Sequence, residues 1–153
     1  MPVVQALHAH GFVAGFSPST LTELERLATR RTYVGGAVIF REGAVCDELF
    51  LVDTGLVALD IFVPGRGPVR ILTVGPGELL GWSALMGTGP MTATATALHE
   101  TGVFAISGAQ LRNLCDSNHA AGCQILRQIN HALSQRLTAT RLQLLDLFAT
   151  PTG

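Results

Sequence analysis

The sequence has few charged residues and no long apolar run. Charged residues make up 14% of the 153 residues and the net charge is −1, whereas a typical soluble domain is about 25% charged. Nothing indicates a basic face for nucleic acid. No apolar run reaches the roughly 18–20 residues that cross a bilayer, and the opening MPVVQALHAHGF lacks the features of a signal peptide. We therefore expect a cytoplasmic protein that binds neither membranes nor nucleic acid directly.

The sequence also lacks the residue patterns of common catalytic and metal sites. The cysteines are odd in number and without CxxC spacing, which favours reduced structural thiols: Cys46, Cys115 and Cys123. Of the five histidines only His99 lies among the expected strands, so the histidine cluster of a metal-binding β-barrel is missing. No G-x-S-x-G motif for a nucleophilic serine is present. We expect no catalytic residues, no metal and no enzyme activity.

What the sequence does have is frequent glycine and proline. Between Tyr33 and Ile106 these residues interrupt short apolar runs such as LFLV, LVALDIFV and VRILTV. Many short strands separated by regular turn signals are typical of a β-sandwich or jelly roll. We predict such a β-roll over residues 33–106, with PGRGP as a hairpin tip. Before it, SPSTLTELERLATRR predicts a helix within residues 16–32, with Ser17 or Ser19 as its cap.

The periodicity becomes helical again after residue 107. Ser107 can cap a short helix, and a long helix is predicted from about His119 to Phe148. Its apolar positions recur mostly every four residues, with Thr140 interrupting them: Ile125, Ile129, Leu133, Leu137, Leu144 and Phe148. Such a helix is about 45 Å long, more than one small domain needs. We expect its outer half to form a homodimer through residues 119–148; the alternative is that the whole apolar stripe packs on the β-roll as core.

The segment GPGELLGWSALMGTGPMTATATA, residues 75–97, resembles a loop that binds phosphate through backbone N–H groups. However, no arginine or lysine lies between Arg70 and Arg112. The loop therefore lacks the positive charge that an anionic ligand usually meets.

The chain resembles the cyclic-nucleotide-binding domains, a family that includes the sensor half of the catabolite activator protein. The resemblance rests on the order helix, β-roll, short helix, long helix, and on YVGGAVIFREGAVCDELFLVDTGLVAL, in which Tyr33, Gly36, Glu42-Gly43, Asp47 and Gly55 match the family's opening strands. LTVGPGELLGWSALM and LSQRLTATRLQLL resemble the phosphate-binding cassette and the central helix. The resemblance implies a mainly β fold, a double-stranded β-helix (jelly roll) with flanking helices, in a single domain.

The resemblance also shows which ligand-binding residues are missing. In binding members the cassette reads Gly-Glu-x-Ala-Leu and later Arg-Ser/Thr-Ala, where the Glu accepts the ribose hydroxyl proton and the Arg pairs with the phosphate. Gly81, Ala84-Leu85 and Thr92-Ala93 fit, but Trp82 replaces the Glu and Met91 the Arg. Losing one member of a buried charge pair costs about 2–5 kcal/mol, or roughly thirty- to several-thousand-fold in affinity. Tight binding of cAMP or cGMP is therefore disfavoured.

Several interpretations of this pocket remain open. Trp82 either fills the nucleotide space or forms an aromatic wall for a flatter or less charged ligand, and Met91 suits both as soft filler. Backbone N–H groups near Ser83 and Ala84, with the Ser83 and Thr92 hydroxyls, can hold a weak anion, and Arg66 or Arg70 are possible substitutes for the missing arginine. Thr140 either presents a hydroxyl to a ligand, as the resemblance implies, or is a tolerated small residue. The candidate ligand-binding residues are Gly81, Trp82, Ser83, Ala84, Met91, Thr92 and Thr140.

We therefore expect a stand-alone sensor domain, without the helix-turn-helix of the catabolite activators, that binds a non-standard small ligand and signals to a partner protein through its long helix. One alternative is a ligand-free dimeric scaffold. Another is weak binding of cAMP or cGMP with a substitute arginine. No other cofactor is expected.

Overall fold

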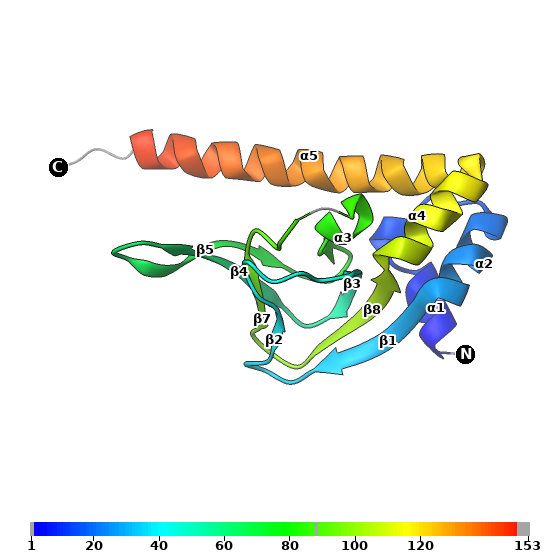
Figure 1. Ribbon diagram of the computed structural model, residues 1–153, viewed down its shortest axis with the longest axis horizontal. Coiled ribbons are helices and arrows are strands. Elements are labelled where there is room, and N and C mark those ends of the chain that lie inside the picture. The colour runs from blue at the N-terminus through cyan, green and yellow to red at the C-terminus, as the bar shows by residue number, and fades with distance from the viewer. Residues whose placement is uncertain (1, 88, 150–153) are drawn as a thin grey trace.

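In the part of the chain that the structure describes, eight antiparallel strands form two four-stranded sheets, which pack into a β-roll (Figure 1). The computed structural model describes residues 2–87 and 89–149, and side chains within residues 4–87 and 89–146. The first sheet has the order β1 (Ala28–Tyr33), β8 (Thr101–Ser107), β3 (Glu48–Thr54), β6 (Leu79–Leu80). The second has the order β2 (Val38–Phe40), β7 (Thr94–Ala97), β4 (Val57–Val63), β5 (Gly67–Val74). The predicted jelly roll with flanking helices is confirmed.

Most of the helices gather at one end of the roll, whereas the short α3 (Ser83–Met86) lies over its middle and α5 (His119–Ala149) extends along its length (Figure 1). The others are α1 (Pro2–His8), the 3-10 helix η1 (Gly11–Val13), α2 (Pro18–Leu27) and α4 (Gly108–Ser117). Ser17 and Ser107 cap α2 and α4 by accepting bonds from the backbone N–H groups of Thr20 and Gln110. Among the described helices, none has the length and apolar composition needed to span a membrane.

The predicted N-terminal helix over residues 16–32 is too long at its end. The helix ends at Leu27, and residues 28–33 form β1, which pairs with β8 from Ala28↔Ile106 to Tyr33↔Thr101. The roll accordingly begins at residue 28 rather than 33. Residues 28–33 form a strand because they pair along their whole length with β8, which lies more than 65 residues away in the sequence. Such tertiary pairing overrides a local preference for helix.

Strand β3 divides the core into two clusters. Since successive side chains of a strand point to opposite faces, Leu49 and Leu51 pack against the helices, whereas Phe50 and Val52 point into the roll. All four are almost fully buried. The β-roll therefore has an interior cluster of its own, and the helices are held by a second cluster on the outer face of the first sheet.

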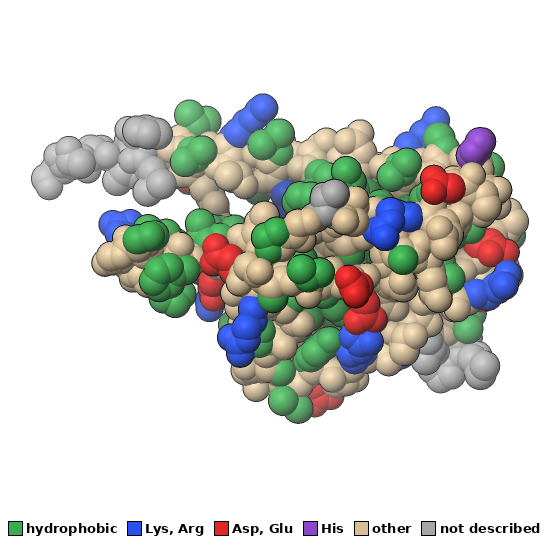
Figure 2. Space-filling view, viewed as in Figure 1, with side chains coloured by type: hydrophobic (Ala, Val, Ile, Leu, Met, Phe, Trp, Pro, Cys, Tyr) green, Lys and Arg blue, Asp and Glu red, His purple; other side chains and the backbone are tan. Residues whose placement is uncertain are grey.

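The two halves of α5 have different surroundings. Its first half packs on the helical core through Ile125 and Ile129, and its second half extends past the roll above the β4–β5 hairpin (Figure 1). Figure 2 shows hydrophobic side chains on this extension. In the predicted apolar stripe, Leu133 is half-buried, Leu137 and Leu144 are 54% and 50% exposed, and Phe148 lies outside the residues whose side chains are described. The stripe thus serves as core only along the first half.

Candidate functional site

The cassette segment is shaped by a tight approach between Gly81 and strand β3. Gly81 has φ +79°, and a Cβ there would lie 2.9 Å from the carbonyl oxygen of Glu48. This position requires glycine for both reasons. The chain then forms the single turn of α3, and Gly87, in the left-handed region at φ +70°, ends it.

The two residues that replace the family's charged ligands lie on different sides of the cassette. Met91 is 5% exposed and belongs to the cluster inside the roll, with Phe40, Leu59 and Leu80, whereas Trp82 is half-buried and packs against the helical cluster. Both line a cavity of about 40 Å³, which we call the cassette cavity. One water molecule takes up about 30 Å³ of the volume of liquid water. The cassette cavity therefore has space for little more than a single water molecule. Met91 supplies the filler predicted for the roll, and Trp82 borders the remaining gap.

The backbone around α3 offers fewer free donors than the sequence suggested. The N–H of Ala84 donates to the Gly81 carbonyl, and that of Leu85 to the Trp82 carbonyl. The carbonyls of Ala84 and Leu85 accept bonds from the Arg112 guanidinium at 2.6 and 3.3 Å. The expected anion contact at the Ala84 N–H is therefore already satisfied by the protein.

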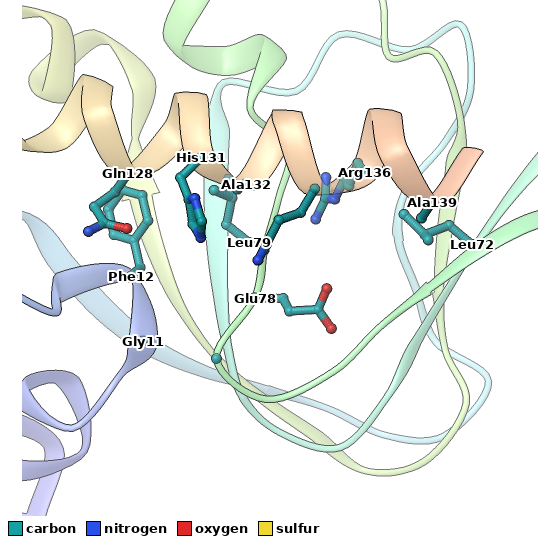
Figure 3. A pocket seen from close by; sticks show the side chains of 12 residues that line it. Gly11, Phe12, Leu72, Glu78, Leu79, Gln128, His131, Ala132, Arg136 and Ala139 are labelled. Atoms are coloured by element: carbon teal, nitrogen blue, oxygen red, sulfur yellow. The ribbon is translucent and has the colours of Figure 1, made fainter. Parts of the chain in front are cut away.

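A larger cavity of about 400 Å³ lies between η1, the turn before β6 and α5, and we call it the helix cavity. Figure 3 shows His131 and Arg136 extending from α5 toward the turn that carries Glu78, and Gln128 lying beside Phe12 of η1. The lining residues are Gly11, Phe12, Leu72, Gly77, Glu78, Leu79, Gln128, His131, Ala132, Gln135, Arg136 and Ala139. None of these residues was predicted as a ligand contact.

Arg136 lines both cavities. Its Nη2 atom is buried and has no hydrogen-bond partner among the residues that the structure describes. The pKa of the Arg136 guanidinium is lowered because burial disfavours its charged form, and the nearby negative charge of Glu78 offsets part of this effect. Because a guanidinium stays protonated in proteins, Arg136 presents a positive charge to the space beneath α5.

The other predicted contacts are distributed unevenly. Gly81, Trp82, Ser83, Met91 and Thr92 line the cassette cavity. Ala84 is buried and lines a different hollow, which Arg112 of α4 also lines. Thr140 is exposed, lines neither named cavity, and donates its hydroxyl hydrogen bond to the Arg136 carbonyl at 2.9 Å. The proposed substitute Arg70 instead bonds Asp60 at 3.3 Å on the surface, and Arg66 is exposed at the hairpin tip.

Arg136 was missed, although the sequence contains a signal for it. The inward positions of α5 are Ile125, Ile129, Ala132, Arg136 and Ala139, which recur with alternating spacings of four and three residues. This is the spacing of one continuous helix face. An arginine at such a position is the unusual buried polar group that points to a ligand or a partner.

Within residues 2–87 and 89–149 no three histidine, cysteine, aspartate or glutamate side chains gather in a way that could hold a metal ion. The three cysteines are free thiols. Burial raises the pKa of the Cys46 and Cys115 thiols, which makes them poorer nucleophiles at neutral pH. None of the three cysteines is among the residues that line the cassette cavity or the helix cavity.

Comparisons with known proteins agree with the resemblance that the sequence motifs indicated. The family model described as "Cyclic nucleotide-binding domain" matches residues 30–118. A CRP-like cAMP-activated global transcriptional regulator of Mycobacterium tuberculosis is 28% identical over 141 residues, which cover 92% of this chain and 61% of that protein. The chain thus spans less than two thirds of that relative.

Solved structures of similar proteins have the same fold. The catabolite activator protein of Thermus thermophilus superimposes with a TM-score of 0.72 at 27% identity, covering 91% of this chain and 63% of the other. A cyclic nucleotide-binding domain from Methylobacillus flagellatus gives a TM-score of 0.83 at 20% identity over 99% and 85% of the two chains. The second comparison supports the fold alone.

Proposed function

Because this chain belongs to the cyclic nucleotide-binding domain family, we propose that it is a regulatory sensor whose ligand is a small anion held between the β-roll and α5. In this proposal the ligand's charge is met by Arg136 from α5 rather than by an arginine of the cassette. The chain is a cyclic-nucleotide-binding-like domain related to CRP-like regulators. The ligand and the signal it sends are the proposed part.

The observation that carries the proposal is the buried Nη2 atom of Arg136, which has no hydrogen-bond partner among the residues that the structure describes. A buried donor without a partner costs about 1–3 kcal/mol, and more when it is charged. If the guanidinium turned so that Nη2 faced the cavity, a ligand carboxylate or phosphate oxygen there would remove that cost and form a charge-assisted bond. A ligand that satisfies such a group gains affinity from it.

Met91 and Trp82 argue against tight binding of cAMP or cGMP in the cassette. Met91 offers no charge to a phosphate, Trp82 offers no acceptor to a ribose hydroxyl, and the cassette cavity of about 40 Å³ would have to open before a nucleotide could enter it. Arg136 lines this cavity as well. Weak binding of a cyclic nucleotide through Arg136 is therefore the second candidate, in place of the Arg66 or Arg70 substitution expected above.

A thermal-shift screen tests the sensor proposal. A ligand at 100 times its dissociation constant adds about 2.7 kcal/mol of stability, which raises the melting temperature of a domain of this size by roughly 5–10 °C. We expect at least one small anion to stabilise the wild type, and Arg136→Gln to lose the response. Arg127→Gln, an exposed arginine of the same helix, is the matched control. A flat response to cyclic nucleotides and metabolite anions alike would favour the ligand-free scaffold.

We further propose that α5 passes the signal on, through a homodimer formed by its outer half. Exposed leucines along this outer half support the dimer: Leu137, Leu142, Leu144 and Leu145. A ligand between roll and helix would change how firmly α5 is held, and so the geometry of a helix pair.

Sedimentation velocity tests the dimer. We expect the wild type to sediment as a dimer and Leu137→Glu as a monomer, because a carboxylate in an apolar helix interface is left without a partner. Met86→Glu, which replaces a 64% exposed side chain of α3, should leave the dimer intact. A wild-type protein that stays monomeric at high micromolar concentration would refute the dimer.

A further inference from the structure

We infer that the ligand occupies the helix cavity rather than the cassette, and that it is a small carboxylic acid with a flat apolar body, such as an aromatic monocarboxylate. This inference rests on the proposed function, since it places the same anion beside the same Arg136. It adds the location and the chemical class of the ligand.

Of the two cavities that Arg136 lines, the volumes favour the helix cavity. Ligand pockets usually measure about 300–1,000 Å³, a range that includes the helix cavity at about 400 Å³ and excludes the cassette cavity at about 40 Å³. The space is created by two small residues, Ala132 and Ala139, at inward positions two turns apart on α5. Larger side chains at these positions would fill it.

The floor of the cavity is held in place by His10. Its Nε2–H donates to the Val52 carbonyl at 2.7 Å, and its Nδ1 accepts from the Phe12 N–H at 3.0 Å. Gln128 of α5 donates to the Ala14 carbonyl at 3.1 Å. The 3-10 helix η1 is therefore fixed to both the roll and α5. A site whose walls are fixed in advance pays less ordering entropy when a ligand binds.

The lining suggests an apolar body with one charged end. Phe12, Leu72 and Leu79 join the two alanines as apolar wall, and the aromatic ring of Phe12 suits a flat partner. Among the polar groups, the Gln128 amide is already engaged with η1. The other polar side chains of the lining are Glu78, His131, Gln135 and Arg136, and among the described residues Arg136 is the one that carries a buried nitrogen without a hydrogen-bond partner.

The charges favour a monoanion. Arg136 contributes one buried positive charge, and Glu78 contributes a negative one at the opposite wall. The Glu78 Oε1 atom accepts a bond from the Gly75 N–H at 3.0 Å, which fixes the carboxylate there. One carboxylate on the ligand balances Arg136, whereas a second negative charge would face Glu78 and be repelled. The ligand class is thus a monocarboxylate rather than a phosphate dianion.

Binding in this cavity would hold α5 against the roll. The ligand would contact Phe12 of η1 and Leu79 of β6 on one side, and Ala132 and Arg136 of α5 on the other. It would therefore clamp the helix that carries the proposed dimer face.

Fluorine NMR of 4-fluorobenzoate, with neutral 4-fluorobenzamide as its matched partner, tests the inference on the whole chain. We expect saturable line broadening with the acid and binding at least about tenfold weaker with the amide, a difference of 1.4 kcal/mol. Ala132→Leu, which fills the cavity, should weaken binding of the acid by at least about tenfold. Ala120→Leu, an exposed position of the same helix, should not. Melting temperatures of both variants check that they remain folded.

The outcomes separate this inference from the proposed function. No binding of the acid at millimolar concentration, binding indifferent to Ala132→Leu, or equal binding of the amide would overturn the inference. If cyclic AMP or phosphate then still binds through Arg136, the proposed function stands and only the location and class are wrong. If Arg136→Gln changes the binding of no anion, the proposed function fails as well.

Discussion

Gly108→Ala is expected to lower the free energy of unfolding by about 3 kcal/mol, the upper end of the usual cost of overpacking. A Cβ at Gly108 would lie 2.2 Å from the carbonyl oxygen of Ala84 and 2.6 Å from its carbonyl carbon. Both are backbone atoms, so no side chain can rotate away. Helices α3 and α4 would have to separate, which would strain the bonds from Arg112 to the carbonyls of Ala84 and Leu85.

Chemical denaturation measures this effect, and Gly35→Ala provides the control. At Gly35 the nearest atoms to a new Cβ lie at 3.5 Å, an ordinary contact distance, and the backbone is not in the left-handed region. We expect that substitution to change stability by less than about 1 kcal/mol. If Gly108→Ala proved as stable as Gly35→Ala, the close packing of α3 on α4 would be refuted.

The double variant Trp82→Glu/Met91→Arg is expected to bind cAMP about thirty- to several-thousand-fold more tightly than the wild type, the equivalent of about 2–5 kcal/mol for a buried charge pair. Removing the indole enlarges the cassette cavity, and the new guanidinium meets the phosphate beside Arg136. Without ligand this variant should be less stable than the wild type, because it places a second cation where Met91 is 5% exposed. Calorimetry measures the affinity and a thermal melt the stability.

Two controls isolate the electrostatic cause. Met91→Leu keeps the site apolar and should give no gain in cAMP affinity. Met86→Arg adds the same charge at a 64% exposed position and should also give none. A folded double variant whose cAMP affinity equals that of the wild type would show that something other than the missing charges closes the cassette.

The sequence was sufficient to predict the β-roll because its signals are local. Glycine and proline mark the turns, and the PGRGP tip between β4 and β5 closes as predicted, with the Arg66 N–H bonded to the Val63 carbonyl. Ser17 and Ser107 cap their helices within three residues of themselves. Where the deciding partner lies far along the chain, as β8 does for β1, local reasoning placed a helix instead of a strand.

The candidate site was predicted only in part, for the same reason. The family motif located the cassette and the absence of its charges, which are properties of adjacent residues. It did not locate the helix cavity, whose walls come from η1, the Gly77–Leu79 turn and α5. The predicted apolar stripe followed Leu133 and Leu137, whereas the inward face passes through Ala132 and Arg136. Neighbouring residues of a helix point about 100° apart. Because the predicted stripe was displaced by one residue, Arg136 was not recognised as an inward position.

The central claim is that Arg136, and not the cassette, meets the charge of any anionic ligand. Calorimetric titration of cyclic AMP into the wild type and into Arg136→Gln tests it most directly. Because both of the family's charged ligands are absent, we predict a dissociation constant no tighter than about 30 µM, thirtyfold above a micromolar site, and no measurable heat of binding with Arg136→Gln. A nanomolar dissociation constant that persists in Arg136→Gln would contradict the claim.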